Sequence, residues 1–311
     1  MTILRNKRIW VAGHRGMVGG ALMRRLEREG CELLHASRAQ LDLRDQQMVR
    51  AWVARERPDL IFVAAAKVGG ILANSTYPAD FLYENLVLET NIIEAAYRQG
   101  VEKLLFLGSS CIYPKYAPQP IPEDSLLSGP LEPTNQWYAI AKIAGLKLAE
   151  AYRLQEGADF ISAMPTNLYG PGDNFDLLTS HVLPALIRKA HEARVNNSES
   201  ITIWGTGNPR REFLHVDDCA DACVFLMQNY SEAEHVNIGS GTDITVRELA
   251  QVICDIVGFD GTVQTDQTKP DGTPQKLMSG DKIRRLGWAP TISLEQGIAE
   301  TYRWFLAQEA A

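Results

Sequence analysis

The chain has 311 residues, of which 45% are hydrophobic, so it can form a large core and two domains. A net charge of −7 without a basic stripe argues against nucleic acid as a partner, and no apolar run approaches the length of a membrane span. The N-terminus lacks the apolar region of a secretory signal, and the five cysteines are scattered, so we expect a reduced, cytoplasmic protein without disulfides.

The first predicted strand, residues 7–11, runs into a glycine-rich turn and then a helix over 21–29. Strand, glycine turn and helix are the context of a dinucleotide-binding fingerprint, although the spacing here is G-x-x-G-x-x-G. The glycines let the backbone approach a pyrophosphate, and the helix N-terminus offers free N–H groups. A turn without a ligand is the alternative. The residues of this predicted cofactor turn are Gly13, His14, Arg15, Gly16, Met17, Val18 and Gly19.

The end of the second predicted strand, residues 32–36, indicates which cofactor binds. An acidic residue at this position binds the ribose of NAD, whereas a basic one accommodates the 2′-phosphate of NADP. Here Arg38 follows the strand, no carboxylate is present, and Arg15 adds a second cation, so we expect NADP(H). A solvated Arg38 is the alternative. Asp42, beside Leu43, could bind the adenine amino group or could cap the next helix.

Further strands over 60–66, 103–107 and 160–165 alternate with helices, one of which ends near 53 while another covers 81–98. This alternation predicts right-handed βαβ units and a parallel sheet. We therefore expect an α/β protein with a Rossmann-type doubly wound parallel sheet and a smaller α/β C-terminal substrate domain. Ligands bind such sheets at the carboxyl ends of the strands, where Ser109, Ser110 and Cys111 follow the fourth strand.

Tyr138 and Lys142 are four residues apart and therefore share one face of a predicted helix. An ammonium favours the phenolate and so lowers the pKa of a neighbouring phenol, which suits proton donation to a carbonyl oxygen that is being reduced. A surface helix with a solvated lysine is the alternative. The proline-rich loop over 114–133 precedes this helix, and we expect it to cover the site.

The composition changes after residue 165. We assign 1–165 to an NADP-binding domain, to which about 213–240 and 290–311 return, and 166–290 mainly to substrate binding. An amphipathic helix over 181–191, a strand over 201–204 and the Arg210–Arg211 pair follow. Arginine pairs with phosphate and Trp204 can stack on a base, so a nucleotide-bearing substrate is expected. The alternative is an ordinary hairpin with a solvated arginine pair.

His215, Cys219 and Cys223 are spaced four apart, which could suggest a metal site. The stretch 217–227 instead predicts a helix that packs both cysteines into a core, so we expect no metal. A helix over 245–257 has Thr245 and Glu248 in a capping-box pattern. A polar loop over 269–276 and a closing helix over 292–306 complete the chain.

Several strings together resemble the extended short-chain dehydrogenase/reductase family. The glycine turn, Ser109 and the Tyr138-x-x-x-Lys142 pair match its general pattern. More specific are GHRGMVG, AAAKVGGI, FLGSSCIYP, EPTN followed by YAIAKIAG, MPTNLYGP and REFLHVDD. These strings resemble the members that act on GDP-4-keto-6-deoxy sugars, and the resemblance extends from Arg8 to Phe305.

The resemblance implies an NADPH-dependent oxidoreductase with epimerase activity that converts GDP-4-keto-6-deoxy-D-mannose into GDP-L-fucose. Epimerisation at C3 and C5 would precede hydride reduction of the C4 ketone. Cys111 resembles the base and His181 the acid of the epimerisation, while Tyr138, Ser109 and Lys142 resemble the reductase set. From the residues alone, Cys111 would be a buried thiol and His181 a polar residue at a helix N-terminus.

The resemblance also implies binding residues and a homodimer, whose contact would be a four-helix arrangement that includes the helices carrying 81–98 and 138–142. Cofactor contacts beyond those named are Leu107, Gly108, Pro165, Thr166, Asn167, Leu168 and His181. GDP-sugar contacts are Lys189, Trp204, Arg211 and Ser279. Ser279 stands where some members carry aspartate, and Trp137 also departs from the pattern. A related GDP-colitose or GDP-heptose activity and a non-catalytic dinucleotide sensor are the alternatives.

Overall fold

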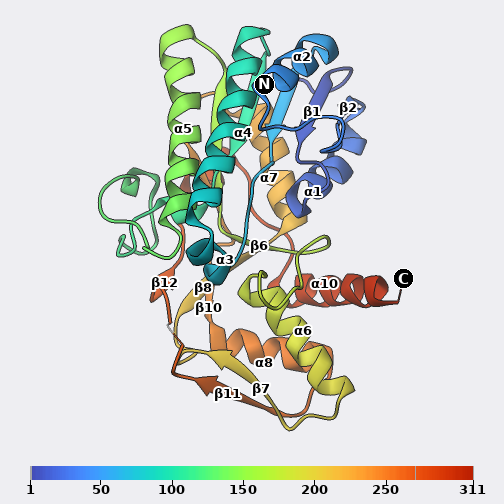
Figure 1. Ribbon diagram of the computed structural model, residues 1–311, viewed down its shortest axis with the longest axis vertical. Helices are drawn as coiled ribbons and strands as arrows, with labels where there is room; N and C mark the ends of the chain where they lie inside the picture. Colours follow the sequence, from blue (N-terminus) through green and yellow to red (C-terminus); the bar gives the residue numbers. More distant parts are fainter. Residues whose placement is uncertain (1, 270, 311) are drawn as a thin grey trace.

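The computed structural model describes residues 2–269 and 271–310 and contains a six-stranded sheet with helices on both faces (Figure 1). Every strand pair in this sheet is parallel, as expected for βαβ connections. In spatial order the strands are β2 (Glu32–Leu34), β1 (Arg8–Ala12), β3 (Leu60–Val63), β4 (Lys103–Leu107), β5 (Phe160–Pro165) and β9 (Val236–Ile238). The predicted Rossmann-type doubly wound fold is confirmed.

Two apolar clusters cover the two faces of this sheet. Leu104 and Phe106 of β4 belong to one cluster, whereas Leu105 and Leu107 belong to the other. The first face packs against α2 (Gln46–Glu56), α4 (Pro78–Arg98) and α5 (Gln136–Glu156), and the second against α1 (Met17–Leu26) and α7 (Val216–Asn229). Strands buried on both faces are continuous apolar runs, which explains why they were predictable.

Element boundaries differ from the prediction mainly at helix N-termini. α1 begins at Met17, inside the glycine turn, rather than at residue 21, and α4 begins at Pro78, because proline is favoured in the first helical turn. Short helical segments fill the connections: η1 (Glu27–Glu29), α3 (Ile71–Thr76), η2 (Ser110–Ile112), η3 (Glu123–Ser125) and α9 (Asp281–Leu286).

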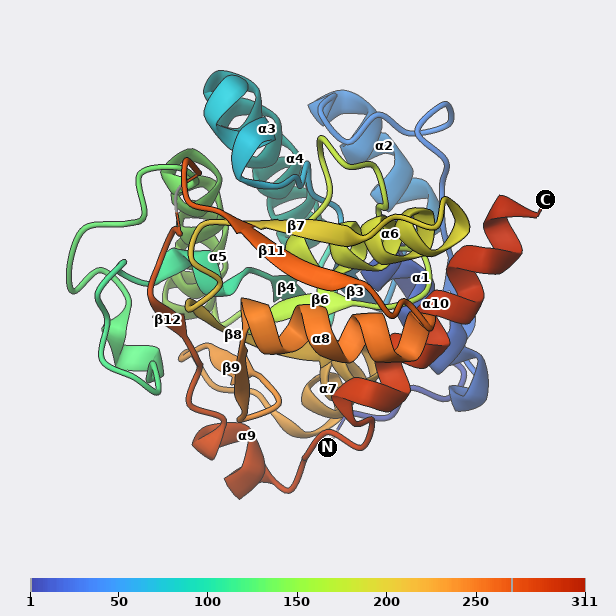
Figure 2. The ribbon, with the colours of Figure 1, turned by 90° about the horizontal axis from the view of Figure 1, so that it is seen from below.

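The second, smaller α/β part is built around β8 (Arg210–His215). β8 pairs in parallel with β6 (Asn167–Tyr169) and β12 (Gln275–Lys276), and antiparallel with β10 (Asp243–Thr245). β7 (Ser200–Trp204) pairs instead with β11 (Thr262–Asp266), and the two strands lie beside α6 (Val182–Val195) and α8 (Val246–Val257) (Figure 2). The alternative of a hairpin across 201–213 is therefore wrong.

The closing segment contacts both parts of the protein, and its assignment to the first domain stays a prediction. The Thr291 amide and hydroxyl bind Asp218 of α7, but α10 (Leu294–Glu309) then packs elsewhere. Its buried Ile298 and Phe305 belong to a third cluster with α6 and α8, because its apolar face complements those helices. The segment 213–240, by contrast, supplies β9 to the large sheet and α7 to the layer that packs on one face of that sheet. The domain division at residue 165 stays a prediction.

Predicted features of α7 and α8 are present. Cys219 and Cys223 are fully buried in the core, and all five cysteines are free. Thr245 and Glu248 form the expected capping box. Within residues 2–269 and 271–310, no helix is long and apolar enough to cross a membrane, and no three His, Cys, Asp or Glu side chains are grouped to hold a metal ion.

Candidate active site

The glycine turn forms a close-packed cradle at the start of α1. Gly13 has a φ of 89°, and a Cβ there would lie 2.7 Å from the backbone of Ala65. Gly16 is the N-cap of α1 without a side-chain cap, and the first turn carries no acidic residue. The free N–H groups of this helix N-terminus are therefore available to an anion, which fits the pyrophosphate of a dinucleotide.

The end of β2 carries the residues predicted to distinguish NADP from NAD. Arg38 is exposed and close enough to Asp42 to contribute to its low pKa. Hydrogen bonds from Arg44, with Nη2 2.8 Å from Oδ2, are the main reason that the pKa of Asp42 is lowered to about 2. Asp45, not Asp42, caps α2 by accepting from the Met48 amide at 3.0 Å. The capping alternative for Asp42 is therefore wrong.

Other predicted cofactor residues surround this region. The His14 ring stacks on His35 with 4.7 Å between the ring centres, and burial lowers the pKa of His14. The Leu43 carbonyl accepts from Asn91 of α4 at 3.0 Å, which fixes the chain after β2. The glycine turn and the end of β2 thus lie side by side, as one dinucleotide would require.

Lys142 on α5 is held by a buried carboxylate. Its Nζ lies 2.7 Å from Oε1 of Glu89 on α4 and donates to the Leu107 carbonyl at 3.0 Å. The Lys142 and Glu89 side chains are 2% and 0% exposed. Gly145 makes this approach possible, because a Cβ there would lie 2.7 Å from Glu89 and 2.5 Å from Phe106.

Glu89 was missed by the sequence analysis, although a signal was present. In the predicted helix over 81–98, the apolar positions Phe81, Leu88 and Ile92 define the face that is buried. Position 89 falls on the same face, and a carboxylate there has to be paired. A charged residue on an apolar helix face was therefore the clue.

Tyr138 lies one helical turn before Lys142, whose Nζ is 5.8 Å from the centre of the phenol ring. The pKa of Tyr138 lies well above its ordinary value, first because of burial and then because of the charges of Cys111 and Glu89. The prediction that Lys142 lowers the pKa of Tyr138 is therefore wrong for the protein without bound cofactor and substrate. The main reason is that burial disfavours the phenolate, and the charges of Cys111 and Glu89 add to this effect.

Ser109 and Cys111 follow β4 in η2. The Ser109 Oγ accepts from the Cys111 backbone amide at 3.4 Å, which joins the two predicted catalytic residues, and Ser110 between them is buried. Cys111 is 6% exposed, and burial raises the pKa of its thiol. Lys276 gives the largest opposing effect, so a nearby cation favours the thiolate. Gly108 precedes this turn where Met164 leaves no room for a side chain.

His181 is brought to the same neighbourhood by the N-terminus of α6. It is the N-cap residue but makes no side-chain cap, so its ring is not used for capping. His181 is exposed, and the pKa of its ring is lowered first by the loss of water to surrounding protein atoms and then by the charge of Lys276. Lys276 on β12 thus acts on both Cys111 and His181. The sequence offered no signal for this residue, which lay in a predicted polar loop.

The run after β5 is anchored to β8. Thr166 and Asn167 both donate from their side chains to the Glu212 carbonyl, at 3.3 and 2.8 Å, and Leu168 pairs with Leu214. Pro165 ends β5 opposite Ile238 of β9. Further along, a Cβ on Gly172 would lie 3.4 Å from the Met17 Cα. The chain that follows the predicted cofactor residues 165–168 therefore comes close to the start of α1 at Gly172.

The predicted GDP-sugar residues lie in the second part of the protein. Lys189 donates to the Thr202 carbonyl at 2.9 Å, two residues before Trp204. Trp204 is 49% exposed, with the Lys269 Nζ 5.6 Å from its ring centre, so the ring is accessible for stacking. Arg211 reaches the carbonyl of Asp271, at 3.5 Å. The Asp271 side chain also accepts a hydrogen bond from the Thr206 amide. The loop that carries Asp271 therefore connects the region of Trp204 with that of Arg211.

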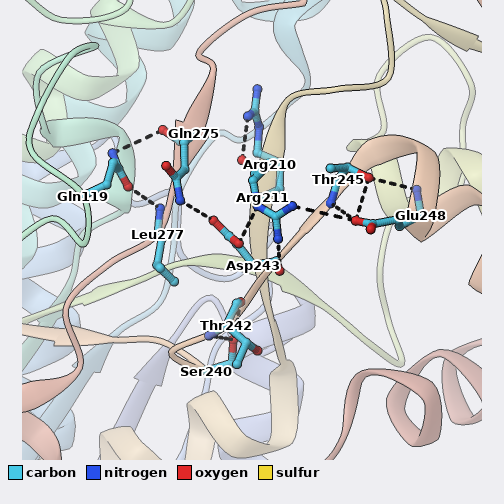
Figure 3. Close-up of polar contacts among 10 residues, drawn as sticks. All are labelled: Gln119, Arg210, Arg211, Ser240, Thr242, Asp243, Thr245, Glu248, Gln275 and Leu277. Carbon is cyan, nitrogen blue, oxygen red and sulfur yellow. Dashed lines mark hydrogen bonds and ion pairs between the residues drawn. The ribbon is translucent and has the colours of Figure 1, made fainter.

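A polar network joins the proline-rich loop to the strands of this second part (Figure 3). Gln119 accepts from the Leu277 amide at 2.8 Å and donates to the Gln275 carbonyl at 3.2 Å. Gln275 donates to Asp243 at 2.7 Å, and Arg210 does so at 2.8 Å. The loop is thereby fixed to β12, which carries Lys276.

Ser279 is fixed to the proline-rich loop, and the second part of the protein also contains a cavity. The Ser279 amide donates to Ile121 of the proline-rich loop at 2.8 Å. A cavity of about 640 Å³ is lined by Arg210, Arg211 and Thr242, among others, but by none of the predicted catalytic residues. The cavity is therefore separate from the Tyr138 and Cys111 side chains.

Comparisons with known proteins show the family of this chain. The model of the NAD dependent epimerase/dehydratase family matches residues 9–239. The GDP-L-fucose synthase of Sinorhizobium fredii is 60% identical over 310 residues, covering 100% of this chain and 99% of the relative. The GDP-L-colitose synthase of Yersinia pseudotuberculosis is 37% identical, covering 97% and 99%. The structure of a GDP-L-fucose synthetase from Naegleria fowleri bound to NADP has a TM-score of 0.91 and 30% identity, covering 100% and 97%.

The position of Arg38 generates a test of cofactor selection. The Arg38→Ala variant should bind NADPH about 10- to 100-fold more weakly and NADH nearly unchanged, because only NADPH carries the 2′-phosphate and a charged hydrogen bond contributes about 1.5–3 kcal/mol. Fluorescence titration with both cofactors measures this, and Arg28→Ala, another exposed arginine, is the control. Equal losses for the two cofactors would show that Arg38 does not contact the phosphate.

Proposed function

The chain belongs to the NAD dependent epimerase/dehydratase family, and we propose on this premise that it converts GDP-4-keto-6-deoxy-D-mannose into GDP-L-fucose with NADPH. One observation carries the proposal: a proton-donor set for reduction and a proton-transfer pair for epimerisation share one neighbourhood. Ser109 contacts the Cys111 amide, and Cys111 in turn influences Tyr138. Lys276 acts on both Cys111 and His181.

Epimerisation is assigned to Cys111 and His181. The 4-ketone acidifies the protons on C3 and C5, so that a base can remove each of them and an acid can return a proton to the opposite face. Cys111, next to the cation of Lys276, is the proposed base, and His181 is the proposed acid. Tyr138 and Ser109 donate hydrogen bonds to the C4 oxygen, which stabilises the enolate.

Reduction uses the same donors. NADPH, when bound in the glycine cradle, supplies hydride to C4. Tyr138 then gives its proton to the C4 oxygen while Ser109 holds that oxygen in place. Lys142 is assigned to the cofactor ribose, and its contact with the Leu107 carbonyl fixes it at the end of β4. One donor set therefore serves both stages.

Substrate binding is assigned to the second part of the protein. We place the guanine against the exposed Trp204 ring and the diphosphate near Lys189 and Arg211. Ser279, fixed to the proline-rich loop, is the fourth contact. A serine cannot replace all the interactions of the aspartate that other members carry, because it has no charge.

The alternatives are less well supported. A related GDP-4-keto-sugar activity is favoured only by Ser279, and the colitose relative is much less similar than the fucose relative. A non-catalytic sensor would not need the complete set of Ser109, Cys111, Tyr138, Lys142 and His181, which this chain retains. Neither alternative has a structural observation of its own.

We further propose a homodimer that is formed through α4 and α5. These long helices lie side by side at the surface (Figure 1). Tyr83 on α4 is 65% exposed, while Trp137 and Ile140 on α5 are 38% and 39% exposed. Large apolar side chains on one helical surface are typical of a protein contact. Two copies would form a four-helix arrangement.

The activity is tested with purified protein, GDP-4-keto-6-deoxy-D-mannose and NADPH. Wild-type protein should oxidise NADPH, followed by absorbance, and NMR should identify GDP-L-fucose. Tyr138→Phe should reduce the rate by about 10²- to 10⁴-fold, because the proton donor is lost. Tyr152→Phe changes the same helix about 21 Å away and should have little effect. No oxidation by the wild type would refute the proposed function.

The role of Cys111 is tested by solvent exchange. Cys111→Ser should slow deuterium entry at C3 and C5 by about 10²-fold or more, because serine is a far weaker base than a thiolate. Mass spectrometry of the product in D₂O provides the measurement, with Cys31→Ser as the control for a cysteine outside the site. Unchanged exchange would remove Cys111 from this role.

The dimer is tested by sedimentation equilibrium. The wild type should have twice the mass of one chain, and Ile140→Glu should shift it to the monomer, because a charge would be buried in the contact. Leu177→Glu alters an equally accessible apolar residue, 39% exposed, in the 170–180 loop and should leave the dimer intact. A monomeric wild type at micromolar concentration would contradict this arrangement.

A further inference from the structure

The connection between β3 and α4, residues 64–77, touches two features of the proposed site. At Ala65 it packs against the glycine turn, where a Cβ on Gly13 would lie 2.7 Å from the Ala65 backbone. Gly70, the N-cap of α3, donates from its amide to the Thr179 carbonyl at 2.9 Å. Thr179 comes two residues before His181. One short segment therefore contacts both the cofactor cradle and the chain that carries the proposed acid.

Two buried asparagines hold this connection in place. Asn85 of α4 accepts from the Lys67 amide at 2.8 Å and donates to the Lys67 carbonyl at 3.1 Å. Asn74 of α3 donates to the carbonyls of Gly69 and Gly70, at 2.7 and 3.1 Å. Asn74 is 5% exposed and Asn85 is 0% exposed. Buried hydrogen bonds of this kind are costly to break, so the turn keeps its shape.

Gly70 lacks room for a side chain because of the contact that it makes, and not because of its backbone angles. Its φ is −66° and its ψ is 179°, which any residue can adopt. A Cβ there would nevertheless lie 2.7 Å from the Ser180 carbonyl oxygen, which is closer than unbonded atoms pack. The obstacle is backbone and cannot rotate away, so a larger residue has to displace the peptide between Ser180 and His181.

The other side of the contact is ordered by its own hydrogen bonds. The Asp176 carboxylate accepts from the Thr179 amide at 3.0 Å and from its hydroxyl at 2.8 Å, and Asn174 donates to the same hydroxyl at 2.8 Å. His181 follows as the N-cap of α6, and its ring makes no cap. The backbone of residues 179–181 therefore decides where this ring lies.

We propose that Gly70 is a positioning residue for the proposed acid: its amide, and its lack of a side chain, fix the backbone of residues 179–181, so that the His181 ring stays at the sugar face to which it returns a proton. Gly70 does not touch the reacting atoms. The inference rests on the role of His181 in the proposed function. Because the same connection packs against the glycine turn, the acid also keeps a constant place relative to the cofactor.

The defect expected from a displaced acid is specific, since different residues serve the two faces of the enolate. The enolate that Cys111 has formed is then protonated less often on the opposite face. It returns instead to the starting ketone by taking back a proton from Cys111, whose thiol exchanges with solvent. In D₂O, recovered starting sugar should therefore gain deuterium at C3 and C5 relative to GDP-L-fucose.

The test is the ratio of deuterated starting sugar to deuterated GDP-L-fucose, measured by mass spectrometry in D₂O and corrected for exchange without protein. Gly70→Ala should raise this ratio by about 10-fold or more, because a displacement of about 1 Å at a reacting group can cost about 100-fold in rate. Gly129→Ala is the control. A Cβ there would make only an ordinary contact of 3.4 Å with Pro114, so the ratio should stay at the wild-type value.

A double variant shows whether Gly70 acts through the acid. His181→Asn should raise the ratio by itself, and Gly70→Ala should add nothing in that background, because changes that act through one group are not additive. A merely structural role would instead lower both deuterated species together, through loss of folded protein, and leave the ratio unchanged. If Gly70→Ala does not fold, Asn74→Ala, which removes two bonds to the turn and adds no atoms, should raise the ratio by a smaller factor.

The outcomes separate this inference from the proposed function. A wild type that forms no GDP-L-fucose would refute the proposed function. An active wild type, together with folded Gly70→Ala or Asn74→Ala protein that keeps the wild-type ratio, would overturn the role of Gly70 alone. A further rise in the double variant would also overturn it, because Gly70 would then act on something other than His181.

Discussion

A carboxylate and an ammonium that are both out of water have to stay together, and this constraint organises the centre of the molecule. Glu89 and Lys142 come from different helices, so α4 and α5 must remain in contact for the pair to form. The ammonium also binds the Leu107 carbonyl, which ties the helices to the end of β4. The turn that carries Ser109 and Cys111 starts there. One buried contact thus joins both helices to the strand end from which the donor turn starts.

The second part of the protein reaches this centre through another buried carboxylate. Glu212 on β8 accepts from the Met278 amide at 3.0 Å and from the Gly241 amide at 2.7 Å, while its carbonyl accepts from Asn167. It therefore holds together the run after β5, the turn after β9 and the segment after β12. Lys276 lies two residues before Met278, so the position of this cation near Cys111 depends on the same contacts.

Much of the fold could be predicted from local pattern. Strands such as 103–107 are apolar on both faces, and the cap at Thr245 is a local signal, so both were found. Pairings between distant segments were not predicted. β7 pairs with β11, and α10 packs on α6 and α8, because complementarity between segments far apart in the chain decides these contacts. The environment of Tyr138 was misjudged for the same reason. A four-residue spacing revealed Lys142, but the carboxylate that pairs with it is 53 positions away in the chain.

The charge of Lys276 acts on both proposed proton-transfer residues, Cys111 and His181, so the protonation of one affects the protonation of the other. A thiolate on Cys111 neutralises part of the lysine charge, so His181 holds a proton more readily. If Cys111 took a proton from the sugar, as proposed, that neutralisation would end, and the charge of Lys276 would favour proton release from His181. The two proposed proton transfers are then coupled through one lysine, whose own pKa burial lowers.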